Sequence, residues 1–458
     1  METSNFKLTQ LREIVLNGDT RALKWRENQL KQLKNLIENH ESEILQALKS
    51  DIGKPKTEAF FEIIALKQEL KYAFSNLKNW MKPSKVQVPL SLQPGSAFQK
   101  FEPLGCVLII GPWNYPFSLT LQPLISAFAA GNTAVLKPSE NAPATSKLIS
   151  KLTKKYFPEN ILVTFEGDGK VAEELISKSF DHIFFTGGGE VGKKVMKSAA
   201  NHLTPVTLEL GGKSPAVIFE DADIEVAGRR LAWGKSLNAG QTCIAPDHLI
   251  VENKVSNKLI ESIKNAIFEF HGEAPLKSNN LAKIINKHHF NRLKNLLENA
   301  KNNKQVIFGG DIDESSNKIS PTIINIKDRN DPLMKEEIFG PLIPVLNFLD
   351  FNNVIKEINQ QPKPLAIYIF GGGSIKQEEI IQKTSSGSVC INDVVLQAGI
   401  PELSFGGVGQ SGIGNYHGYA GFKTFSHEKS ILKKPFWLDV KFRYPPYKVD
   451  IDILKKLF

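Results

Sequence analysis

Residues 105–138 read GCVLIIGPWNYPFSLTLQPLISAFAAGNTAVLKP. The apolar run 107–110 predicts a buried strand of the parallel-sheet type, because such strands are covered on both faces. A rigid turn follows, then an apolar helix over 119–130 and a second buried strand over 133–137. This alternation predicts a doubly wound α/β domain, in which ligands lie beyond the carboxyl ends of the strands. Asn114, Lys137 and Glu140 follow those ends.

The chain before this stretch is predicted to be helical and then extended. Residues 5–82 carry apolar side chains at helical spacing and predict four helices. Asp19 or Thr20 can cap the second helix. Gly53 ends the third helix, and Pro55 suits the first turn of the fourth. Residues 84–104 contain three prolines and alternate locally, which predicts an extended arm with a strand.

The chain after it alternates again and predicts a second α/β domain. A buried-type strand over 182–186 still belongs to the first domain. The later predicted strands are 214–219, 248–251, 306–308 and 385–392, and the predicted helices are 222–236, 255–270 and 286–301. The chain ends on a short amphipathic stretch, Val449–Phe458.

Residues 205–246 hold two candidate catalytic side chains. Cys243 follows small and polar residues, Asn-Ala-Gly-Gln-Thr, which favour a tight and accessible backbone where a thiol can attack an electrophile. Cys106 and Cys390 lie in apolar runs and are interpreted as core residues. Glu209 lies among apolar neighbours just before a glycine turn, so a raised proton affinity would let it act as a base. The alternative is a surface glutamate at a strand end.

The segment Gly187-Gly-Gly-Glu-Val-Gly-Lys-Lys194 allows three interpretations. It satisfies the dinucleotide fingerprint G-x-G-x-x-G, with an acid at Glu209. It is also close to a phosphate-binding P-loop, but Lys194 stands where a hydroxyl should hold magnesium, so phosphoryl transfer is disfavoured. The third interpretation is a resemblance: Phe185-Thr-Gly-x-x-x-Val-Gly192 resembles a family turn in which a helix start faces a pyrophosphate.

Composition and charge limit the possible classes of protein. With 458 residues, 41% hydrophobic and 23% charged, the chain is typical of a globular protein of two or three domains. No apolar run is long enough to cross a bilayer, the first residues do not resemble a secretory signal, and three cysteines favour a reducing compartment such as the cytoplasm. No Cys/His spacing predicts a metal site.

The net charge of +9 could serve an anionic substrate, a membrane surface or nucleic acid. The basic residues are spread through mixed-sign helical stretches, which favours a solvated surface. We therefore expect no nucleic acid partner, no transmembrane segment and no peripheral membrane contact.

The two segments Leu-Glu209-Leu-Gly-Gly-Lys-Ser-Pro and Gly-Gln-Thr-Cys243, in this order and spacing, resemble the signatures of the NAD(P)-dependent aldehyde dehydrogenase superfamily. Cys-Ile-Ala-Pro-Asp247 and Tyr416-His-Gly418 resemble its class 3 branch. Residues 401–414 are similar to a glycine-rich family segment, with Ser404 in place of its proline. The resemblance covers the chain from about residue 5 to about residue 446.

The resemblance implies an α/β aldehyde dehydrogenase-like fold: two doubly wound Rossmann-type domains and a small β oligomerisation arm. The implied limits are 1–82 for the helical part of the cofactor domain, 83–104 for the bridging arm, 105–210 for NAD(P) binding, 211–400 for the catalytic domain with Cys243, and 401–458 for a return segment, bridging arm and tail. Class 3 relatives are typically homodimers, so a homodimer is expected.

The resemblance also assigns residues. It makes Cys243 the nucleophile, Glu209 the base and Asn114 the side-chain donor to the oxyanion. It favours the pyrophosphate interpretation of the Gly187 turn, although Gly188 and Gly189 depart from the bulkier residues usual there. The implied cofactor-binding residues are Ile110, Gly111, Pro112, Trp113, Lys137, Glu140, Thr186, Gly187, Val191, Gly192, Glu337 and Phe339.

Lys137 and Glu140 would approach the adenosine ribose, where Glu140 would repel a 2′-phosphate unless it swings away. The expected cofactor is therefore NAD or NADP, with NAD slightly favoured. The implied reaction is oxidation of a medium- or long-chain aliphatic or aromatic aldehyde to the carboxylic acid. Two alternatives remain: a CoA-acylating relative, disfavoured because such relatives commonly lack a glutamate at the Glu209 position, and a non-catalytic binding protein, disfavoured by the intact Cys243, Glu209 and Asn114.

Overall fold

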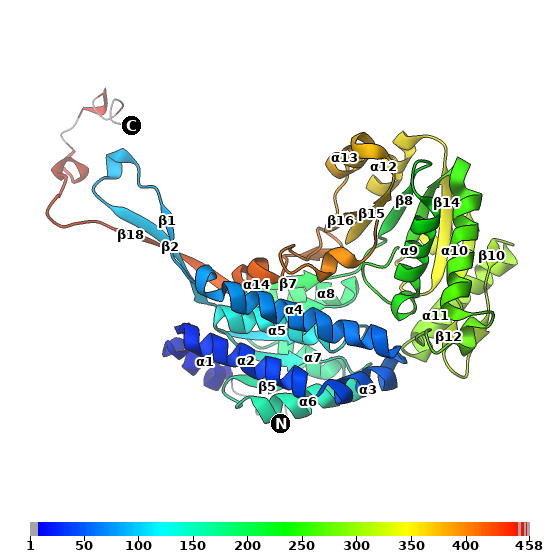
Figure 1. Ribbon diagram of the computed structural model, residues 1–458. Coiled ribbons are helices and arrows are strands. Elements are labelled where there is room, and N and C mark those ends of the chain that lie inside the picture. The colour runs from blue at the N-terminus through cyan, green and yellow to red at the C-terminus, as the bar shows by residue number, and fades with distance from the viewer. Residues whose placement is uncertain (1–7, 448–449, 453–454, 456–458) are drawn as a thin grey trace.

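Two large, mostly parallel sheets and a small antiparallel one organise the chain (Figure 1). The computed structural model describes residues 8–447, 450–452 and 455, apart from the side chain of Phe442. The first residues of the predicted N-terminal helix, 5–7, lie outside the described residues, as does part of the stretch Val449–Phe458.

The first large sheet has six strands in the order β17-β7-β6-β3-β4-β5. All neighbours are parallel except β17, which runs antiparallel to β7. The strands are β3 Cys106–Ile110, β4 Thr133–Lys137, β5 Leu162–Thr164, β6 His182–Thr186, β7 Val206–Glu209 and β17 Gly412–Ile413. Strand order reverses between β3 and β6, so the carboxyl ends of these two strands form the switch point where such sheets bind ligands.

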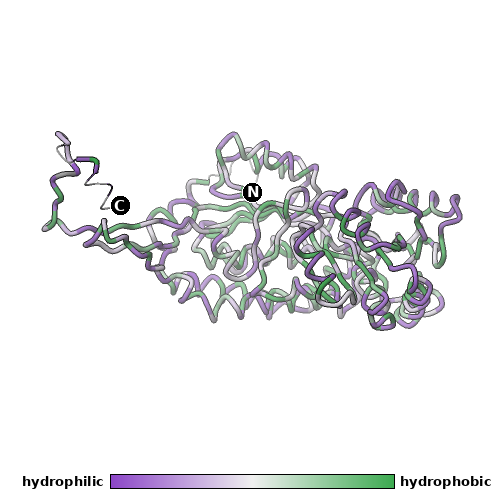
Figure 2. The backbone as a smooth tube through the Cα atoms, turned by 90° about the horizontal axis from the view of Figure 1, so that it is seen from above, coloured by the Kyte–Doolittle hydropathy of each residue, from purple (hydrophilic) through white to green (hydrophobic). Residues whose placement is uncertain are grey.

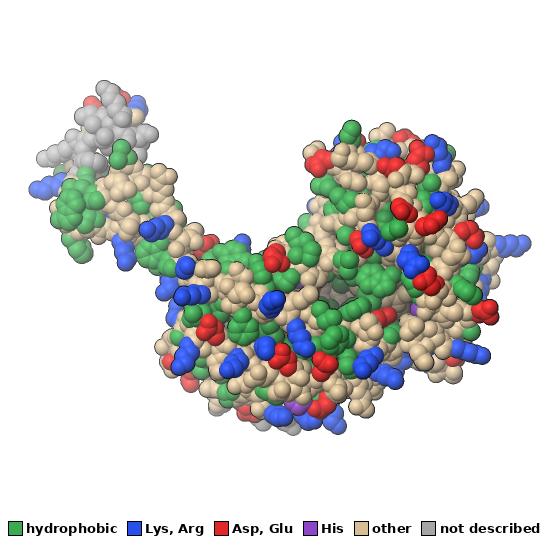
Figure 3. Space-filling model, in the orientation of Figure 1, with side chains coloured by type: hydrophobic (Ala, Val, Ile, Leu, Met, Phe, Trp, Pro, Cys, Tyr) green, Lys and Arg blue, Asp and Glu red, His purple; other side chains and the backbone are tan. Residues whose placement is uncertain are grey.

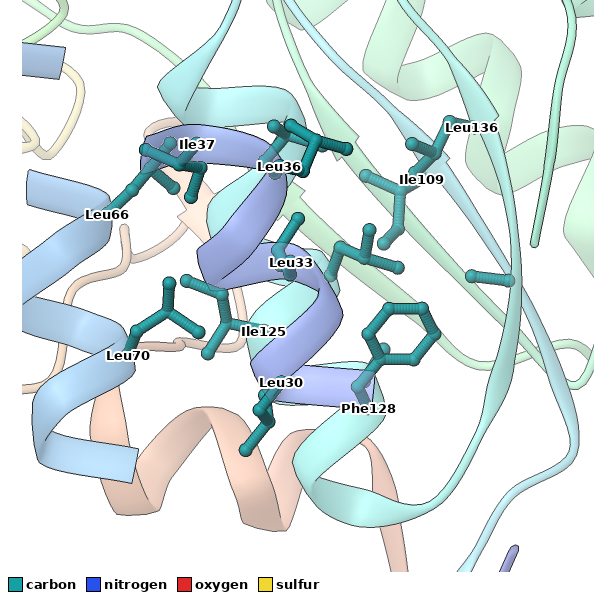
Figure 4. Close-up of a cluster of buried hydrophobic side chains, with 14 of the residues drawn as sticks. Leu30, Leu33, Leu36, Ile37, Leu66, Leu70, Ile109, Ile125, Phe128 and Leu136 are labelled. Carbon is teal, nitrogen blue, oxygen red and sulfur yellow. The ribbon is translucent and has the colours of Figure 1, made fainter. Parts of the chain in front are cut away.

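Helices cover both faces of this sheet because alternate side chains of each strand point to opposite faces. Val107 and Ile109 of β3 join the core under the helices α2 to α6, whereas Leu108 and Ile110 join the core under α1, α7 and α8. The helices are α1 Leu8–Leu16, α2 Leu23–Asn39, α3 Glu41–Ile52, α4 Lys56–Trp80, α5 Ser118–Ala130, α6 Pro143–Tyr156, α7 Gly169–Ile176 and α8 Gly189–Ala199. Figure 4 shows the leucines of α2 facing Ile125 and Phe128 of α5 and the strand residues Ile109 and Leu136.

The predicted four N-terminal helices are confirmed, with one correction at a helix start. Gly53 ends α3 in the left-handed conformation, with φ of 70°, and its N–H donates to the Lys49 carbonyl. The prediction that Asp19 or Thr20 caps α2 is wrong. Asp19–Arg21 form a short 3-10 helix of their own, and α2 starts after Ala22 with no side-chain cap.

The second large sheet has seven strands in the order β10-β13-β14-β9-β8-β15-β16, parallel except at β10. Helices again lie on both faces, so the predicted doubly wound α/β fold is confirmed for both sheets. The strands are β8 Pro215–Ile218, β9 His248–Glu252, β10 Val306–Phe308, β13 Thr322–Ile326, β14 Leu342–Phe348, β15 Ala366–Phe370 and β16 Ser388–Ile391. The helices are α9 Ile224–Ser236, α10 Ser256–His271, α11 Lys287–Asn302, α12 Phe351–Asn359 and α13 Gly373–Lys383, and a hairpin is formed by β11 Ile312–Asp313 and β12 Lys318–Ile319.

The arm is a three-stranded antiparallel sheet that projects from the body on the side away from the second large sheet (Figure 1). It consists of β1 Ser84–Val86, β2 Ser96–Pro103 and β18 Ser426–Lys433, so the predicted arm takes its third strand from the far end of the chain. Helix α14 Gly418–Thr424 leads into β18. Seen from above, the arm stands clear of the body, in which hydrophobic strands run between more hydrophilic helices (Figure 2).

Large apolar side chains are exposed on the arm and on the segment that follows β18. They are Val86, Leu90, Leu92, Leu432, Phe436, Trp437 and Leu438. Figure 3 shows hydrophobic surface on the arm and the segment after it. Within the described part of the chain, no helix is both long enough and apolar enough to span a bilayer.

Candidate active site

A cleft of about 620 Å³ lies between the carboxyl ends of β3, β6 and β7 and residues of the second large sheet's half. Figure 3 shows the surface hollowed between these two parts of the molecule. The cleft brings together all but one of the predicted site residues: Ile110, Gly111, Pro112, Trp113, Asn114, Lys137, Glu140, Thr186, Gly187, Val191, Glu209, Cys243, Glu337 and Phe339. The exception is Gly192, which is buried beneath the cleft wall, where a Cβ would lie 2.9 Å from a methyl carbon of Leu210.

Cys243 follows a strained turn between α9 and β9. Asn238 and Ala239 both adopt left-handed backbone conformations, with φ of 52° and 51°, and Gly240 follows with φ of 73°. Residues other than glycine rarely adopt this conformation, so tertiary contacts must hold it. The predicted tight backbone is therefore present, and Cys243 is half-buried at its end. Of the other two cysteines, Cys106 is a core residue as predicted, whereas Cys390 is half-buried.

The Cys243 thiol lies in an environment that disfavours its ionised form. Burial raises its pKa to about 12, and the nearby carboxyl groups of Glu337 and Glu209 add to the effect. A thiolate at this position therefore needs positive charge or hydrogen-bond donors to be brought beside it.

Glu209 is the last residue of β7, held between Thr186 of β6 and Gly412 of β17. It is 3% exposed, which excludes the alternative of a surface glutamate. Neither carboxylate oxygen has a hydrogen-bond partner among the described residues. Burial raises the pKa of Glu209 well above its ordinary value of 4.5. A buried carboxyl group with free oxygens can take a proton from a water molecule in the cleft.

Asn114 connects the turn after β3 to the turn before Cys243. Its side-chain Nδ2 donates to the Gln241 carbonyl at 3.1 Å, and its own backbone carbonyl accepts from Asn238 Nδ2 at 2.9 Å. The amide is therefore oriented at the same loop that carries the thiol. An amide N–H with a fixed orientation can also donate to an oxyanion that forms beside it.

The first sheet supplies one wall of the cleft. Lys137 is 1% exposed, and its Nζ donates to the Pro138 carbonyl at 2.8 Å and to Glu140 Oε2 at 3.2 Å. Burial lowers the pKa of Lys137 despite the Glu140 carboxylate. Helix α8 begins beside Gly187 and Gly188 with no side-chain cap, so its first N–H groups are available to an anion in the cleft.

The loop after β13 supplies the facing wall. Glu337 lies against the Gly211 turn so closely that a Cβ on Gly211 would be 1.9 Å from Glu337 Oε2. Burial raises the pKa of Glu337 to about 8, although the Gly212 N–H and Lys213 oppose this. Phe339 stands edge-on to Trp113, with ring centroids 5.2 Å apart. Together these contacts make the Glu337–Phe339 loop part of the cleft rather than an isolated polar turn.

A buried ion pair holds that loop. Lys213 Nζ bonds Asp247 Oδ2 at 2.5 Å and also donates to the carbonyls of Leu333 and Glu336. Asp247 Oδ1 in turn accepts the Ile338 N–H at 2.8 Å. Lys213 and Asp247, which lie four positions after Glu209 and Cys243, therefore help to fix the position of Glu337 as well.

Sequence reasoning missed several residues that line the cleft. His289 and Arg292 of α11 face it, and Arg292 donates to the carbonyls of Glu337 and Ile338. Phe405 and Tyr416 line it from the return segment. The sequence predicted the helix over 286–301, but an amphipathic helix with a polar face gives no indication of which cleft it borders.

Comparisons with known proteins identify the family. The aldehyde dehydrogenase family model matches residues 19–431. The chain is 41% identical to aldehyde dehydrogenase family 3 member H1 of Arabidopsis thaliana, over 97% of this chain and 92% of the relative. It is 42% identical to the dimeric NADP-preferring aldehyde dehydrogenase of Rattus norvegicus, over 97% of this chain and 98% of the relative.

The fold matches a solved structure, the substrate-bound state of Staphylococcus aureus AldH, with a TM-score of 0.95, 41% identity, and coverage of 100% of this chain and 99% of that chain. The chain belongs to the aldehyde dehydrogenase family and is an oxidoreductase that oxidises aldehydes. The class 3 resemblance of residues 243–247 and 416–418 is confirmed by the family 3 relative.

Proposed function

We propose that the chain oxidises its aldehyde through a covalent intermediate on Cys243. The observation that carries the proposal is the convergence of Cys243, Glu209 and Asn114 on one cleft. The Cys243 thiolate adds to the aldehyde carbon, and the carbonyl oxygen becomes the oxyanion of a thiohemiacetal. Collapse of that oxyanion expels the aldehyde hydrogen as hydride and leaves a thioester on Cys243.

Asn114 stabilises the oxyanion. Its Nδ2 is held at the Gln241 carbonyl, close to the loop that carries the thiol, and the Cys243 backbone N–H is a second candidate donor. Preorganised donors act on the charge that develops in the transition state, and loss of one typically costs about 2.7–4 kcal/mol.

Glu209 completes the reaction by accepting a proton from the water that attacks the thioester, which releases the carboxylic acid and restores the thiolate. Its buried carboxyl oxygens, free of protein partners among the described residues, support this role. The same observation supports hydrolysis over transfer of the acyl group to CoA, because water is far less acidic than a thiol and depends more strongly on a base.

The cleft fits a nicotinamide dinucleotide. The uncapped start of α8 suits a diphosphate, and the Gly187 turn is close-packed, since a Cβ on Gly187 would lie 2.6 Å from the Phe185 ring. Lys137 and Glu140 would hold the adenosine ribose, and Glu337 the other ribose, beside Phe339. When bound, the oxidised nicotinamide accepts the hydride, and its positive charge favours the Cys243 thiolate. We propose NAD or NADP, with NAD slightly favoured because the Glu140 carboxylate would repel a 2′-phosphate.

We further propose medium- or long-chain aliphatic or aromatic aldehydes as substrates, a homodimer and a cytoplasmic location. Phe405, Tyr416 and Leu119 add apolar surface to the cleft, which suits such substrates. The exposed apolar side chains of the arm support self-association. The three cysteines, none of them in a disulfide, support a reducing compartment.

The test is the absorbance of reduced nicotinamide after the protein is mixed with an aliphatic or an aromatic aldehyde and NAD or NADP, without CoA. Steady turnover is expected, and the rate ratios rank the cofactors and substrates. A single-equivalent burst that only CoA converts to turnover would overturn the hydrolytic mechanism.

A further inference from the structure

The strained loop before Cys243, Leu237–Gln241, is held by a side chain from a distant part of the chain. Asn238 and Ala239 are consecutive left-handed residues, a conformation that is strained for residues with a Cβ. Asn adopts this conformation more readily than most residues, whereas Ala239 has no local reason to adopt it. Contacts from outside the loop must therefore compensate for the cost.

Glu58 makes one of those contacts. It lies in the first turn of α4, and its Oε2 accepts the Asn238 backbone N–H at 2.8 Å, across 180 positions of sequence. Helix α4 covers the first large sheet, whereas Asn238 belongs to the segment between α9 and β9. The bond therefore ties the half that carries Asn114 to the half that carries Cys243.

Asn238 passes this constraint to Asn114. Its Nδ2 donates both to the Asn114 carbonyl, at 2.9 Å, and to the Gln241 carbonyl, at 3.1 Å. The Asn114 Nδ2 donates to that same Gln241 carbonyl. Gln241 is fixed in turn, because its Nε2 donates to the Asn238 and Lys283 carbonyls and its Oε1 accepts the Ile285 N–H. The chain of contacts from Glu58 thus ends on the amide and on the loop of the thiol.

We propose that Glu58 is a positioning residue that holds the Leu237–Gln241 loop in its left-handed conformation and so sets the Asn114 amide relative to Cys243. Glu58 does not touch the reacting atoms. It acts through Asn238 and Asn114, and the inference rests on the proposed oxyanion role of Asn114.

The hydrogen bond between Glu58 and the Asn238 N–H can be distinguished experimentally from a role of Glu58 in packing. The Asn238 N–H needs an acceptor, not a particular volume, because a buried N–H without one is costly. Glu58→Gln keeps an acceptor oxygen at this position, and Glu58→Ala removes it. Thr57→Ala is the matched control, because Thr57 precedes Glu58 in the same helical turn and is exposed.

The experiment measures kcat, KM and cofactor binding for Glu58→Ala, Glu58→Gln and Thr57→Ala, each alone and with Asn114→Ala. We expect Glu58→Ala to lower kcat about 10- to 100-fold with little change in cofactor Kd, since a small misplacement of a catalytic group has effects of this size. Glu58→Gln should recover most of the rate, and Thr57→Ala should match the parent. In the Asn114→Ala background, Glu58→Ala should cost less than about 2-fold more, because the two residues act as one unit.

Other results would overturn the inference. Parent-like kcat in Glu58→Ala would show that the Leu237–Gln241 loop keeps its conformation without Glu58. An equal loss in both backgrounds would show that Glu58 does not act through Asn114. If Asn114→Ala alone left kcat unchanged, the oxyanion role in the proposed function would be the part that failed. Should Glu58→Ala not fold, Glu58→Asp, which withdraws the carboxylate by one methylene, supports the same comparison.

Discussion

Cys243 and Glu209 face one cleft, and both must be deprotonated in the proposed mechanism. The thiol must lose its proton to attack and the carboxyl must be ionised to accept one, although burial raises the pKa of each group. Their separate roles can be resolved by removing one at a time.

Cys243→Ala should abolish aldehyde oxidation and leave cofactor binding intact, because it removes only the attacking atom. Glu209→Gln should form one equivalent of reduced cofactor and then stop at the thioester, because the water lacks a base. Stopped-flow absorbance distinguishes a burst of reduced cofactor, expected for Glu209→Gln, from no signal, expected for Cys243→Ala. Mass spectrometry identifies the acyl group on Cys243. Full turnover by either variant would contradict the assigned roles.

The rate of the hydrolytic step should rise with pH. The folded-state pKa of Glu209 lies above 4.5, so at low pH the carboxyl is protonated and cannot accept a proton from water. The rate of thioester breakdown, followed in single turnovers, should therefore climb as Glu209 ionises. The slow residual breakdown in Glu209→Gln should lack this rise, and an identical profile in the two proteins would place the base elsewhere.

At the scale of single residues, those that belong to family motifs could be predicted from the sequence. The residues that hold these motifs in position could not. Cys243, Glu209 and Glu337 were found because each lies in a short segment of known pattern, and the fold brings them together in the cleft. Gly192 belongs to the same kind of segment, yet its missing Cβ makes room for Leu210 instead of lining the cleft. Glu58 and Arg292 act across long sequence distances, and helical periodicity carries no information about such contacts.

Helix α5 shows how one element can depend on another for its start. Its N-cap residue, Phe117, offers no side-chain acceptor, and Glu62 of α4 accepts the N–H groups of Phe117 and Ser118 instead. The other Glu62 oxygen bonds Lys54 Nζ at 2.5 Å, and both side chains are fully buried. The turn between β3 and α5, which carries Asn114, is thus fixed from outside.

Glu62→Ala should destabilise the protein by about 3–5 kcal/mol, because it leaves Lys54 buried without its partner and α5 without its cap. Urea denaturation of the variant measures the loss. Replacing both residues, Lys54→Met with Glu62→Gln, should recover part of it, since the uncompensated charge is gone. A double variant no more stable than Glu62→Ala would contradict the attribution of the loss to the unpaired Lys54 charge.

Element types were predictable because the apolar spacing along the chain changes from helical to strand-like at each boundary. The helices predicted over 255–270 and 286–301 correspond to α10 and α11 within about one residue at each end. The error at Asp19 is local: Asp19–Arg21 form a separate 3-10 helix, and α2 begins only after Ala22, at Leu23, with no side-chain cap.

On the scale of the whole molecule, Glu69 joins the beginning of the chain to its end. Its Oε1 accepts the Gly418 N–H at 2.6 Å, across 349 positions, and the residue is 1% exposed. Burial raises its pKa from 4.5 to about 7. The fold therefore favours the protonated form, so this contribution to stability is complete below about pH 4.5 and is lost as the pH rises through about 7.

Glu69→Gln should remove that pH dependence. The neutral amide keeps an acceptor for Gly418, so the variant should gain stability over the parent as the pH rises, by up to the order of 3 kcal/mol above pH 7. Thermal denaturation of both proteins across this pH range measures the difference. A difference that stays constant with pH would show that folding does not raise the pKa of Glu69.

The arm should make the protein a dimer. Light scattering is expected to give about twice the chain mass of 51.0 kDa. Leu90→Glu with Leu432→Glu should yield monomers, because both leucines are exposed on the arm, at 90% and 56%. Leu349→Glu, at an 86% exposed leucine near α12, is the control and should stay dimeric. A monomeric parent protein would contradict the proposal.

The overall architecture was predictable from the strand–helix alternation and the two family signatures, and the fold class is confirmed. The domain limits stay predictions. The resemblance assigned part of residues 401–458 to the arm. The pairing of β17 with β7 and the register of β18 on β2 could not be predicted, because strands of two and eight residues with exposed faces carry no apolar pattern that identifies a partner.

Strand β17 is translated long after its partner β7, and this order has a consequence for synthesis on the ribosome. Strand β7, which ends on Glu209, lacks its outer neighbour until Gly412 and Ile413 have been translated, after the whole of the second large sheet. The nascent first large sheet therefore has an unpaired edge at β7 while the second large sheet is synthesised, and an unpaired strand edge is prone to aggregation. A chaperone that shields this edge would raise the yield of folded enzyme, and a chain stopped before residue 412 would be lost to aggregation.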